Sequence, residues 1–165
     1  MTDLSLTLSP LTPADLPAID KLDDRAFGPG RFALTAYRLR EGVSPDPELS
    51  FVAHVGTLLV GANRMTAIKA GGAPALLLGP LTVDPPFRSR GIGEALMMKS
   101  METARACGHR LVILVGDEPY YKRVGFQRVP QGRLTMPGPV DPARVLYCEL
   151  VEGAFEGLMG TIARA

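Results

Sequence analysis

Cysteine and histidine are scarce in this sequence of 165 residues. Cys107 and Cys148 are far apart and outside any CxxC spacing, which excludes a disulfide framework and a cysteine-based zinc site. His54 and His109 are the two histidines, so a histidine-rich metal centre is also excluded. We therefore expect no metal cofactor, and we expect both cysteines to be reduced packing residues.

The sequence also lacks a charge of one sign and a long apolar run. Its net charge is +1, and no basic stripe is present that could follow a phosphodiester backbone, so we expect no nucleic-acid partner. The N-terminus has no charged segment followed by a long apolar one. No later apolar run reaches the roughly 18 residues that cross a bilayer. We expect a cytoplasmic protein that does not bind membranes.

Apolar residues, by contrast, are abundant. They make up 46% of the chain, which is enough for one buried core at this length. No internal repeat, low-complexity tract or linker divides the sequence. We therefore expect a single domain spanning residues 1–165.

The first half of the sequence alternates between strand and helix patterns. Leucines that alternate with polar residues over positions 4–8 are typical of a half-buried strand. Thr12 as N-cap and Pro13 at the first helical position predict a helix that runs to Phe27 and ends at the Gly-Pro-Gly that follows. The other elements expected here are a helix over 32–40 and strands over 50–55 and 57–66.

The second half predicts a strand, a helix and further strands. The apolar run 75–83 is typical of a central strand, and residues 91–107 follow a helical period that ends at Gly108. The side of that helix expected to be apolar carries Ile92, Leu96, Ser100, Thr103, Ala104 and Cys107. Later elements are expected over 111–115, 118–124 (a helix), 126–129 and 145–151.

A strand, helix and strand in succession indicate a crossover between parallel strands, whereas the flanking strands are antiparallel in character. The expected fold class is therefore α/β, with a central mixed sheet flanked by helices. The last expected strand, 145–151, offers an exposed edge for a homodimer.

A glycine-containing loop joins the strand at 75–83 to the helix that follows it. The first amides of a helix have no intrahelical acceptors, and the helix dipole adds positive charge there, so the loop predicts an anion site. Arg88 and Arg90 add charge, and Gly91 and Gly93 let the backbone approach a phosphate. A Rossmann motif would need a third glycine where Leu96 stands, and a Walker A motif is absent. Taken alone, the loop also fits a purely structural helix start.

Two motifs in this sequence resemble those of the GNAT superfamily. The family's Arg-x-x-Gly-x-Gly signature for acetyl-CoA is met by Arg88, Gly91 and Gly93. Downstream, residues 121–126 (Tyr-Lys-Arg-Val-Gly-Phe) are similar to the family's Tyr-x-x-x-Gly-Phe segment, in the expected order. The ending over 149–157 is similar to a bacterial subgroup of predicted N-acetyltransferases.

The resemblance implies an N-acetyltransferase that uses acetyl-CoA and transfers an acetyl or short acyl group to a primary amine of a small molecule or a protein. In the family the amine attacks directly, so no acyl-enzyme nucleophile is required. Main-chain groups of the strand and loop would hold the CoA. The implied cofactor-binding residues are Leu81, Thr82, Val83, Arg88, Ser89, Arg90, Gly91, Ile92, Gly93 and Glu94.

Tyr121 is the implied catalytic residue, because the family's tyrosine lies near the thioester sulfur and protonates the departing thiolate. A main-chain N–H near Val83 would polarise the carbonyl oxygen. Taken alone, Tyr121 also fits a packing residue, and the adjacent Tyr120 is a second candidate acid. The general base stays open among Asp84, Asp117, Glu118 and His54.

Two alternative functions fit parts of the same sequence: a non-catalytic module that binds acyl-CoA, and a nucleotide-binding domain. The resemblance places the acceptor cleft near residues 27–48. Nearby acidic side chains fit either attraction of a cationic amine or a solvated polar face; they are Asp23, Asp24, Glu41 and Glu48.

Overall fold

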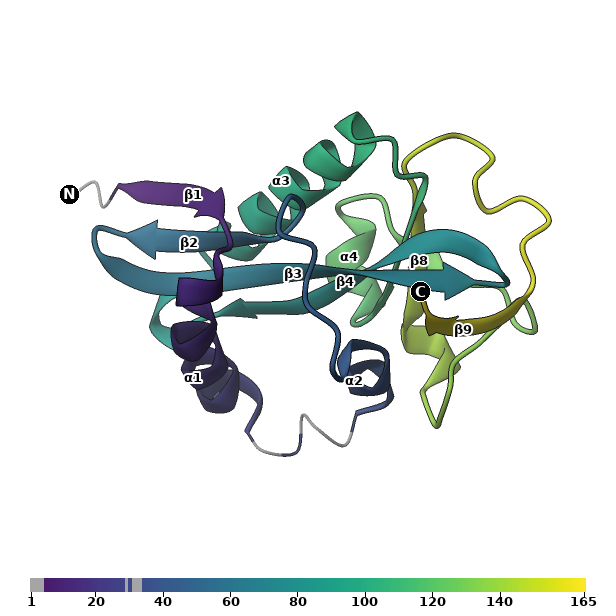
Figure 1. Cartoon of the computed structure of the whole chain (residues 1–165), viewed down its shortest axis with the longest axis horizontal. Coiled ribbons are helices and arrows are strands. Elements are labelled where there is room, and N and C mark those ends of the chain that lie inside the picture. Colours follow the sequence, from purple (N-terminus) through teal and green to yellow (C-terminus); the bar gives the residue numbers. More distant parts are fainter. Residues whose placement is uncertain (1–4, 29, 31–33) are drawn as a thin grey trace.

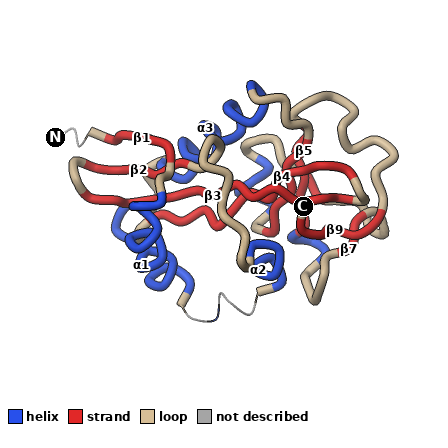
Figure 2. Tube along the Cα trace, in the orientation of Figure 1, coloured by secondary structure: helices blue, strands red, loops and turns tan. Residues whose placement is uncertain are grey.

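The computed structural model describes residues 5–28, 30 and 34–165 of the chain. These residues form a nine-stranded sheet in the order β1-β2-β3-β4-β5-β8-β6, and β9 pairs with β3 and β7 (Figures 1 and 2). The strands are β1 (Leu6–Pro10), β2 (Phe51–Val55), β3 (Leu58–Ala70), β4 (Ala73–Val83), β5 (Leu111–Val115), β6 (Gln127–Arg128), β7 (Leu134–Thr135), β8 (Val145–Glu149) and β9 (Gly160–Arg164). The helices are α1 (Leu16–Phe27), α2 (Thr35–Arg40), α3 (Ile92–Ala106) and α4 (Glu118–Lys122), with short 3-10 turns η1 (Pro13–Asp15), η3 (Pro85–Phe87) and η4 (Pro142–Arg144).

The sheet is mixed because β4 and β5 run parallel while β1 to β4 form an antiparallel meander. Helix α3 connects β4 to β5, as the strand, helix and strand pattern predicted. The expected fold class, α/β with a mixed sheet flanked by helices, is confirmed.

Helices α1 and α3 cover opposite faces of the sheet (Figure 1). Alternation along β4 shows this directly: the Thr82 hydroxyl donates to Asp23 of α1 at 2.6 Å, whereas a Cβ on Gly93 of α3 would lie 3.5 Å from the neighbouring Val83 side chain. The side of α3 that faces the sheet is buried through Leu96, Met97 and other residues, so the amphipathic pattern has the predicted effect.

A β-bulge bends β4 in its middle. Asn63 pairs with Leu81 but Met65 pairs with Leu78, so Gly79 and Pro80 together stand opposite a single residue of β3. A bulge of this kind kinks its strand. In the described residues β4 pairs with β5 only at two positions before the bulge, which leaves the last part of β4 separated from β5.

Several expectations need correction. The strand expected over 145–151 is no free edge, because β8 pairs with β5 on one side and β6 on the other. Cys107 is exposed and therefore not a packing residue, while Cys148 is buried as expected. Thr12 begins the turn η1 and not the helix itself. Two strands near the C-terminus, β7 and β9, were not predicted (Figure 2).

The other elements appear where they were expected, with shifted ends. Strand β3 is longer than predicted, and the helix expected over 32–40 begins at Thr35, after the extended N-cap Leu34. Positions 32 and 33 of that prediction lie outside the described residues. Positions 4 and 29, named in the predicted first strand and helix end, lie outside them too.

Candidate active site

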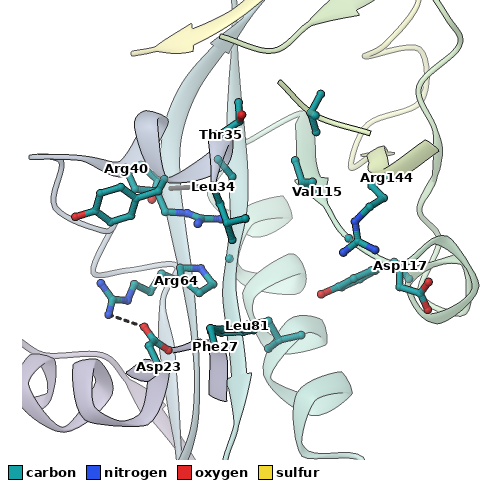
Figure 3. A pocket seen from close by; sticks show the side chains of 18 of the residues that line it. Asp23, Phe27, Leu34, Thr35, Arg40, Arg64, Leu81, Val115, Asp117 and Arg144 are labelled. Atoms are coloured by element: carbon teal, nitrogen blue, oxygen red, sulfur yellow. Dashed lines mark hydrogen bonds and ion pairs between the residues drawn. The ribbon is translucent and has the colours of Figure 1, made fainter. Parts of the chain in front are cut away.

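Two cavities meet at the separated end of β4. The first, here called the loop groove, has a volume of about 610 Å³ and lies between β4, the loop 88–91 and the start of α3. The second, here called the cleft, has a volume of about 1110 Å³ and lies between α1, α2, the bulge of β4 and the segments 115–121 and 139–144 (Figure 3). Both are lined by Phe27, Leu81, Tyr120 and Tyr121. These four residues therefore form the junction of the two cavities.

The loop groove contains nine of the ten residues predicted to bind CoA. They are Leu81, Thr82, Val83, Arg88, Ser89, Gly91, Ile92, Gly93 and Glu94. Arg90 is the tenth and is not among the lining residues; its guanidinium lies 5.5 Å from the centre of the Phe87 ring. The side chain of Arg88 turns back and donates from Nε to the Val83 carbonyl at 3.3 Å.

The loop before α3 has the backbone of an anion site. Gly91, the N-cap, has φ 80°, and a Cβ there would meet no atom within 4 Å, so its surface opens onto free space. Ser89 has φ 63°, a conformation that a non-glycine residue adopts at a cost of about 1–3 kcal/mol and that is often retained at functional sites. The amides of Ile92, Gly93 and Glu94 come before the first intrahelical hydrogen bond and have no acceptor in α3. A phosphate can therefore be bound by main-chain N–H groups here.

The last residues of β4 direct alternate main-chain groups away from β3, and of these the Val83 carbonyl accepts from Arg88. The Asp84 N–H donates to the Val60 carbonyl at 2.8 Å, which makes this position a hydrogen-bonded pair of the antiparallel ladder. Because such pairs alternate, the N–H and C=O groups of Leu81 and Val83 point away from β3. The Val83 N–H is therefore directed away from β3, in a residue that lines the loop groove, and its role as the polarising group stays a prediction.

Tyr121, on α4, lies at the junction of the loop groove and the cleft. Its ring packs against Gly116, where any Cβ would collide with it, and lies edge-on to Phe126 with ring centres 6.0 Å apart. Burial raises the pKa of Tyr121 to about 12, with Tyr120 and Asp117 adding to the rise and two arginines opposing it. The phenol therefore keeps its proton at neutral pH and is available as a donor.

Tyr120 points toward the loop instead. Its hydroxyl lies 2.9 Å from the position that a Cβ on Gly93 would occupy, so only glycine allows this approach of α3. Burial and the Glu94 carboxylate raise the pKa of Tyr120, and Arg123, whose guanidinium lies 5.6 Å from the ring centre, opposes the rise. The two tyrosines, with ring centres 4.9 Å apart, thus have different surroundings, which sequence spacing alone does not resolve.

Two groove residues were not predicted. Arg123 lines the loop groove, and its Nη2 lies 3.3 Å from the Glu94 carboxylate. Phe87 lines the groove from η3. Arg123 lies inside the downstream motif, two residues after Tyr121, so its proximity to that tyrosine was the available signal.

The candidate bases separate clearly. Asp117 is the one of the four that lines the cleft. Asp84 lies 3.4 Å from Arg25, Glu118 lies 3.1 Å from Arg128, and His54 sits on β2 opposite β1. Of the acidic residues expected near the acceptor, Asp23 and Asp24 line the cleft, whereas Glu41 and Glu48 do not.

The described part of the chain contains no group of three or more His, Cys, Asp or Glu side chains that could hold a metal ion. Among its helices, none has the length and apolar character needed to cross a membrane.

Comparison with known proteins identifies the family. The family model of the GNAT acetyltransferase domain matches residues 46–128. The uncharacterized N-acetyltransferase YjhQ of Escherichia coli K12 is 31% identical over 118 residues, which are 69% of this chain and 65% of that protein. The chain therefore spans about two thirds of the length of YjhQ. The uncharacterized N-acetyltransferase YhbS of the same strain is 25% identical over 157 residues, 91% of this chain and 90% of that protein.

Solved structures share the fold. The crystal structure of the GNAT family N-acetyltransferase YhbS from Escherichia coli, in complex with CoA, aligns with a TM-score of 0.84 and 23% identity, covering 100% of this chain and 92% of that one. A GNAT family acetyltransferase from Brucella melitensis, in complex with acetyl-CoA, aligns with a TM-score of 0.63 and 25% identity, covering 93% and 99%.

The match to the family model places residues 46–128 in the class of acetyltransferase domains. More particularly, the chain belongs to the GNAT family, since the family model covers half of it. The resemblance inferred from the Arg-x-x-Gly-x-Gly and Tyr-x-x-x-Gly-Phe motifs is thereby confirmed.

Proposed function

We propose that this protein transfers an acetyl or other short acyl group from acyl-CoA to a primary amine. The observation that carries the proposal is the meeting of the loop groove and the cleft at Tyr120 and Tyr121. A thioester held along β4 and an amine entering through the cleft would reach the same point from opposite sides. One cavity alone would serve a binding module, whereas two cavities with a shared wall suit a transfer between two substrates.

The lining of the loop groove supports CoA as its ligand. Main-chain groups of Leu81 and Val83 would bind the amide-bearing arm, and the amides of Ile92, Gly93 and Glu94 would bind the pyrophosphate. Open space in front of Gly91 leaves room for that anion. Thr82 would not bind CoA directly, because its hydroxyl is bonded to Asp23 and its main-chain groups face β3 in the alternating ladder.

The proposed reaction is direct attack. The amine nitrogen uses its lone pair to form the C–N bond with the thioester carbonyl carbon, and the C–S bond breaks with its electron pair going to sulfur. The Val83 N–H would stabilise the charge that develops on the carbonyl oxygen. Tyr121 would donate its proton to the departing sulfur, which leaves as the CoA thiol. The amine gives up one proton, and Tyr121 regains one from solvent, so that the net result is an amide and a thiol. Asp117 lines the cleft, and this position supports it as the group that accepts the amine proton, directly or through water.

The test combines binding and turnover. Calorimetric titration measures the affinity for acetyl-CoA, and the rate at which free CoA thiol is released with each of a panel of primary amines measures acyl transfer. We expect Tyr121→Phe to lower kcat by about 100-fold or more, the usual effect of losing a general acid, with acetyl-CoA affinity retained. Tyr120→Phe is the matched control, because it removes the neighbouring hydroxyl and is expected to affect kcat less.

Each negative result has a distinct meaning. Acetyl-CoA binding without turnover on any amine would identify the non-catalytic module. Tighter binding of ATP or NAD than of CoA in a competition titration would identify the nucleotide-binding domain. Equal kcat for wild type and Tyr121→Phe would remove Tyr121 from the mechanism.

A further inference from the structure

Arg40 is a partly buried cation in the cleft that the proposed chemistry does not use. It is the last residue of α2, and its guanidinium lies against the bulge of β4: Nη2 is 2.9 Å from the position that a Cβ on Gly79 would occupy. Its Nε is buried and has no hydrogen-bond partner. Among residues 5–28, 30 and 34–165, no carboxylate forms an ion pair with it.

The unpartnered Nε of Arg40 is unusual. A polar atom that is shielded from water is normally hydrogen-bonded, and this one is not. Burial, followed by the nearby charge of Arg64, lowers the pKa of Arg40 to about 10, with Asp23 and Tyr121 opposing the shift. Arg40 therefore stays charged at neutral pH and has a donor available for an anion that enters the cleft.

Within the described residues, no aspartate of the cleft forms an ion pair with Arg40, although the charge of Asp23 acts on it. Arg64 pairs with two of these aspartates: its Nη2 lies 3.1 Å from Asp20 and 3.2 Å from Asp23, and Figure 3 shows the contact with Asp23. Asp23 also accepts from Thr82 at 2.6 Å. Asp23, the carboxylate whose charge raises the pKa of Arg40, is thus already bonded to Arg64 and Thr82.

A second cation faces Arg40 across the cleft. Arg144, on η4, lies on the opposite side of the cavity, and the two guanidinium groups point inward from different elements (Figure 3). Within the described part of the chain, Arg144 has no ion pair either. Both arginines lie close enough to Tyr121 to oppose the rise of its pKa, so both stand near the junction where transfer would occur.

We propose that the acceptor is a small amine that also carries an anionic group, a carboxylate or a phosphate, and that Arg40 binds this group with Arg144 opposite. This inference rests on the proposed function and names its substrate class. A guanidinium can bind either oxyanion with two parallel hydrogen bonds, which fixes both position and orientation. The anion would neutralise this charge, and the amine of the same molecule would be directed toward Tyr121 and Asp117.

Matched pairs of amines test the inference. Amino acids are compared with their carboxamides, and phosphoethanolamine with ethanolamine; spermidine serves as the cationic amine. We expect kcat/KM to be at least about 30-fold higher for the anionic member of one pair, since a buried charged site rejects ligands that leave it unpaired. The pair that responds distinguishes carboxylate from phosphate. A preference for neutral or cationic amines would overturn the inference and leave the proposed function intact.

Substitution of Arg40 gives the second arm. Arg40→Met keeps the length of the side chain without the charge, and we expect it to raise KM for the anionic amine at least about 30-fold while acetyl-CoA affinity is unchanged. Arg144→Met is the companion variant, because Arg144 is exposed and its replacement leaves the core intact. An unchanged KM in folded Arg40→Met protein would refute the role of Arg40.

A binding readout keeps this inference separate from the proposed function. Calorimetric titration of the preferred anionic amine into CoA-loaded protein requires no turnover. Binding by wild type that is lost in Arg40→Met and weakened in Arg144→Met supports the anion site even if no acetyl transfer occurs. Binding of none of the anionic amines by wild type overturns it, whatever the outcome of the acetyl-CoA titration.

Discussion

Replacement of Gly91 tests the anion site most directly. Gly91→Glu and Gly91→Gln introduce side chains of the same size at φ 80°, so both lose about 1–2 kcal/mol of stability to backbone strain. A Cβ at this position meets no atom within 4 Å, so either side chain enters the open groove without disturbing the core. The two variants therefore differ in charge alone.

The magnitude follows from Coulomb's law. A carboxylate about 5 Å from two phosphate charges, at an effective dielectric constant of about 40–80, costs roughly 2–3 kcal/mol. We expect acetyl-CoA to bind Gly91→Glu about 30- to 150-fold more weakly than Gly91→Gln, and the gap to narrow in high salt because the groove is exposed to solvent.

The assay is calorimetric titration with acetyl-CoA at low and high salt, with circular dichroism to show that both variants are folded. Equal affinities for the two variants would refute the placement of the pyrophosphate at the start of α3. Tight binding by wild type in that case would mean that CoA lies elsewhere in the cavity system.

Three other predictions concern the same region and the rest of the fold. The pKa of Tyr121 is raised from 10.0 to about 12 in the folded state, so the folded protein binds this proton more tightly than the unfolded chain. Between pH 10 and 12 the free energy of unfolding of the wild type should therefore fall by about 2 kcal/mol more than that of Tyr121→Phe, as measured by urea titration. Parallel plots of unfolding free energy against pH for the two proteins would contradict this. Gly93→Ala should lower the free energy of unfolding by about 0.5–1 kcal/mol less in a Tyr120→Phe background than in the wild type, because the new Cβ meets the Tyr120 hydroxyl. Additive effects of the two substitutions on the free energy of unfolding would show that this contact does not matter. Cys107 should react with a thiol reagent in the native state and Cys148 only on unfolding, because burial hides the Cys148 thiol and raises its pKa; native labelling of both residues, followed by mass spectrometry, would contradict this.

Local signals predicted which residues would gather around the glycine-containing loop. The strand, glycine loop and helix over residues 81–96 are contiguous, and their properties depend on neighbours in the chain: an apolar run, a left-handed Gly91 and a helix start. Nine of the ten predicted residues consequently line one groove. The Arg90 side chain was the exception, because its stacking on Phe87 depends on side-chain orientation, which spacing does not specify.

The acceptor side was predicted poorly for the opposite reason. Arg40, Arg64 and Arg144 lie far apart in the sequence and come together only through the folding of α2 and η4 around the bulge of β4. The pairing of Arg64 with Asp20 and Asp23 decides which cation is left without a partner. Neither composition nor periodicity contains that information.

What the sequence by itself determined is the fold class, the family and the glycine-containing loop before α3, since these follow from hydrophobic period, turn residues and contiguous motifs. Strand order and register belong to the tertiary structure: β8 lies between β5 and β6 and is no edge, and β9 returns to pair with β3. The one-residue bulge that separates β4 from β5 likewise depends on pairing with a distant strand. Because non-local pairing decides where side chains from separate segments converge, the cleft, its unpaired arginine and the separate surroundings of Tyr120 and Tyr121 could come only from the folded chain.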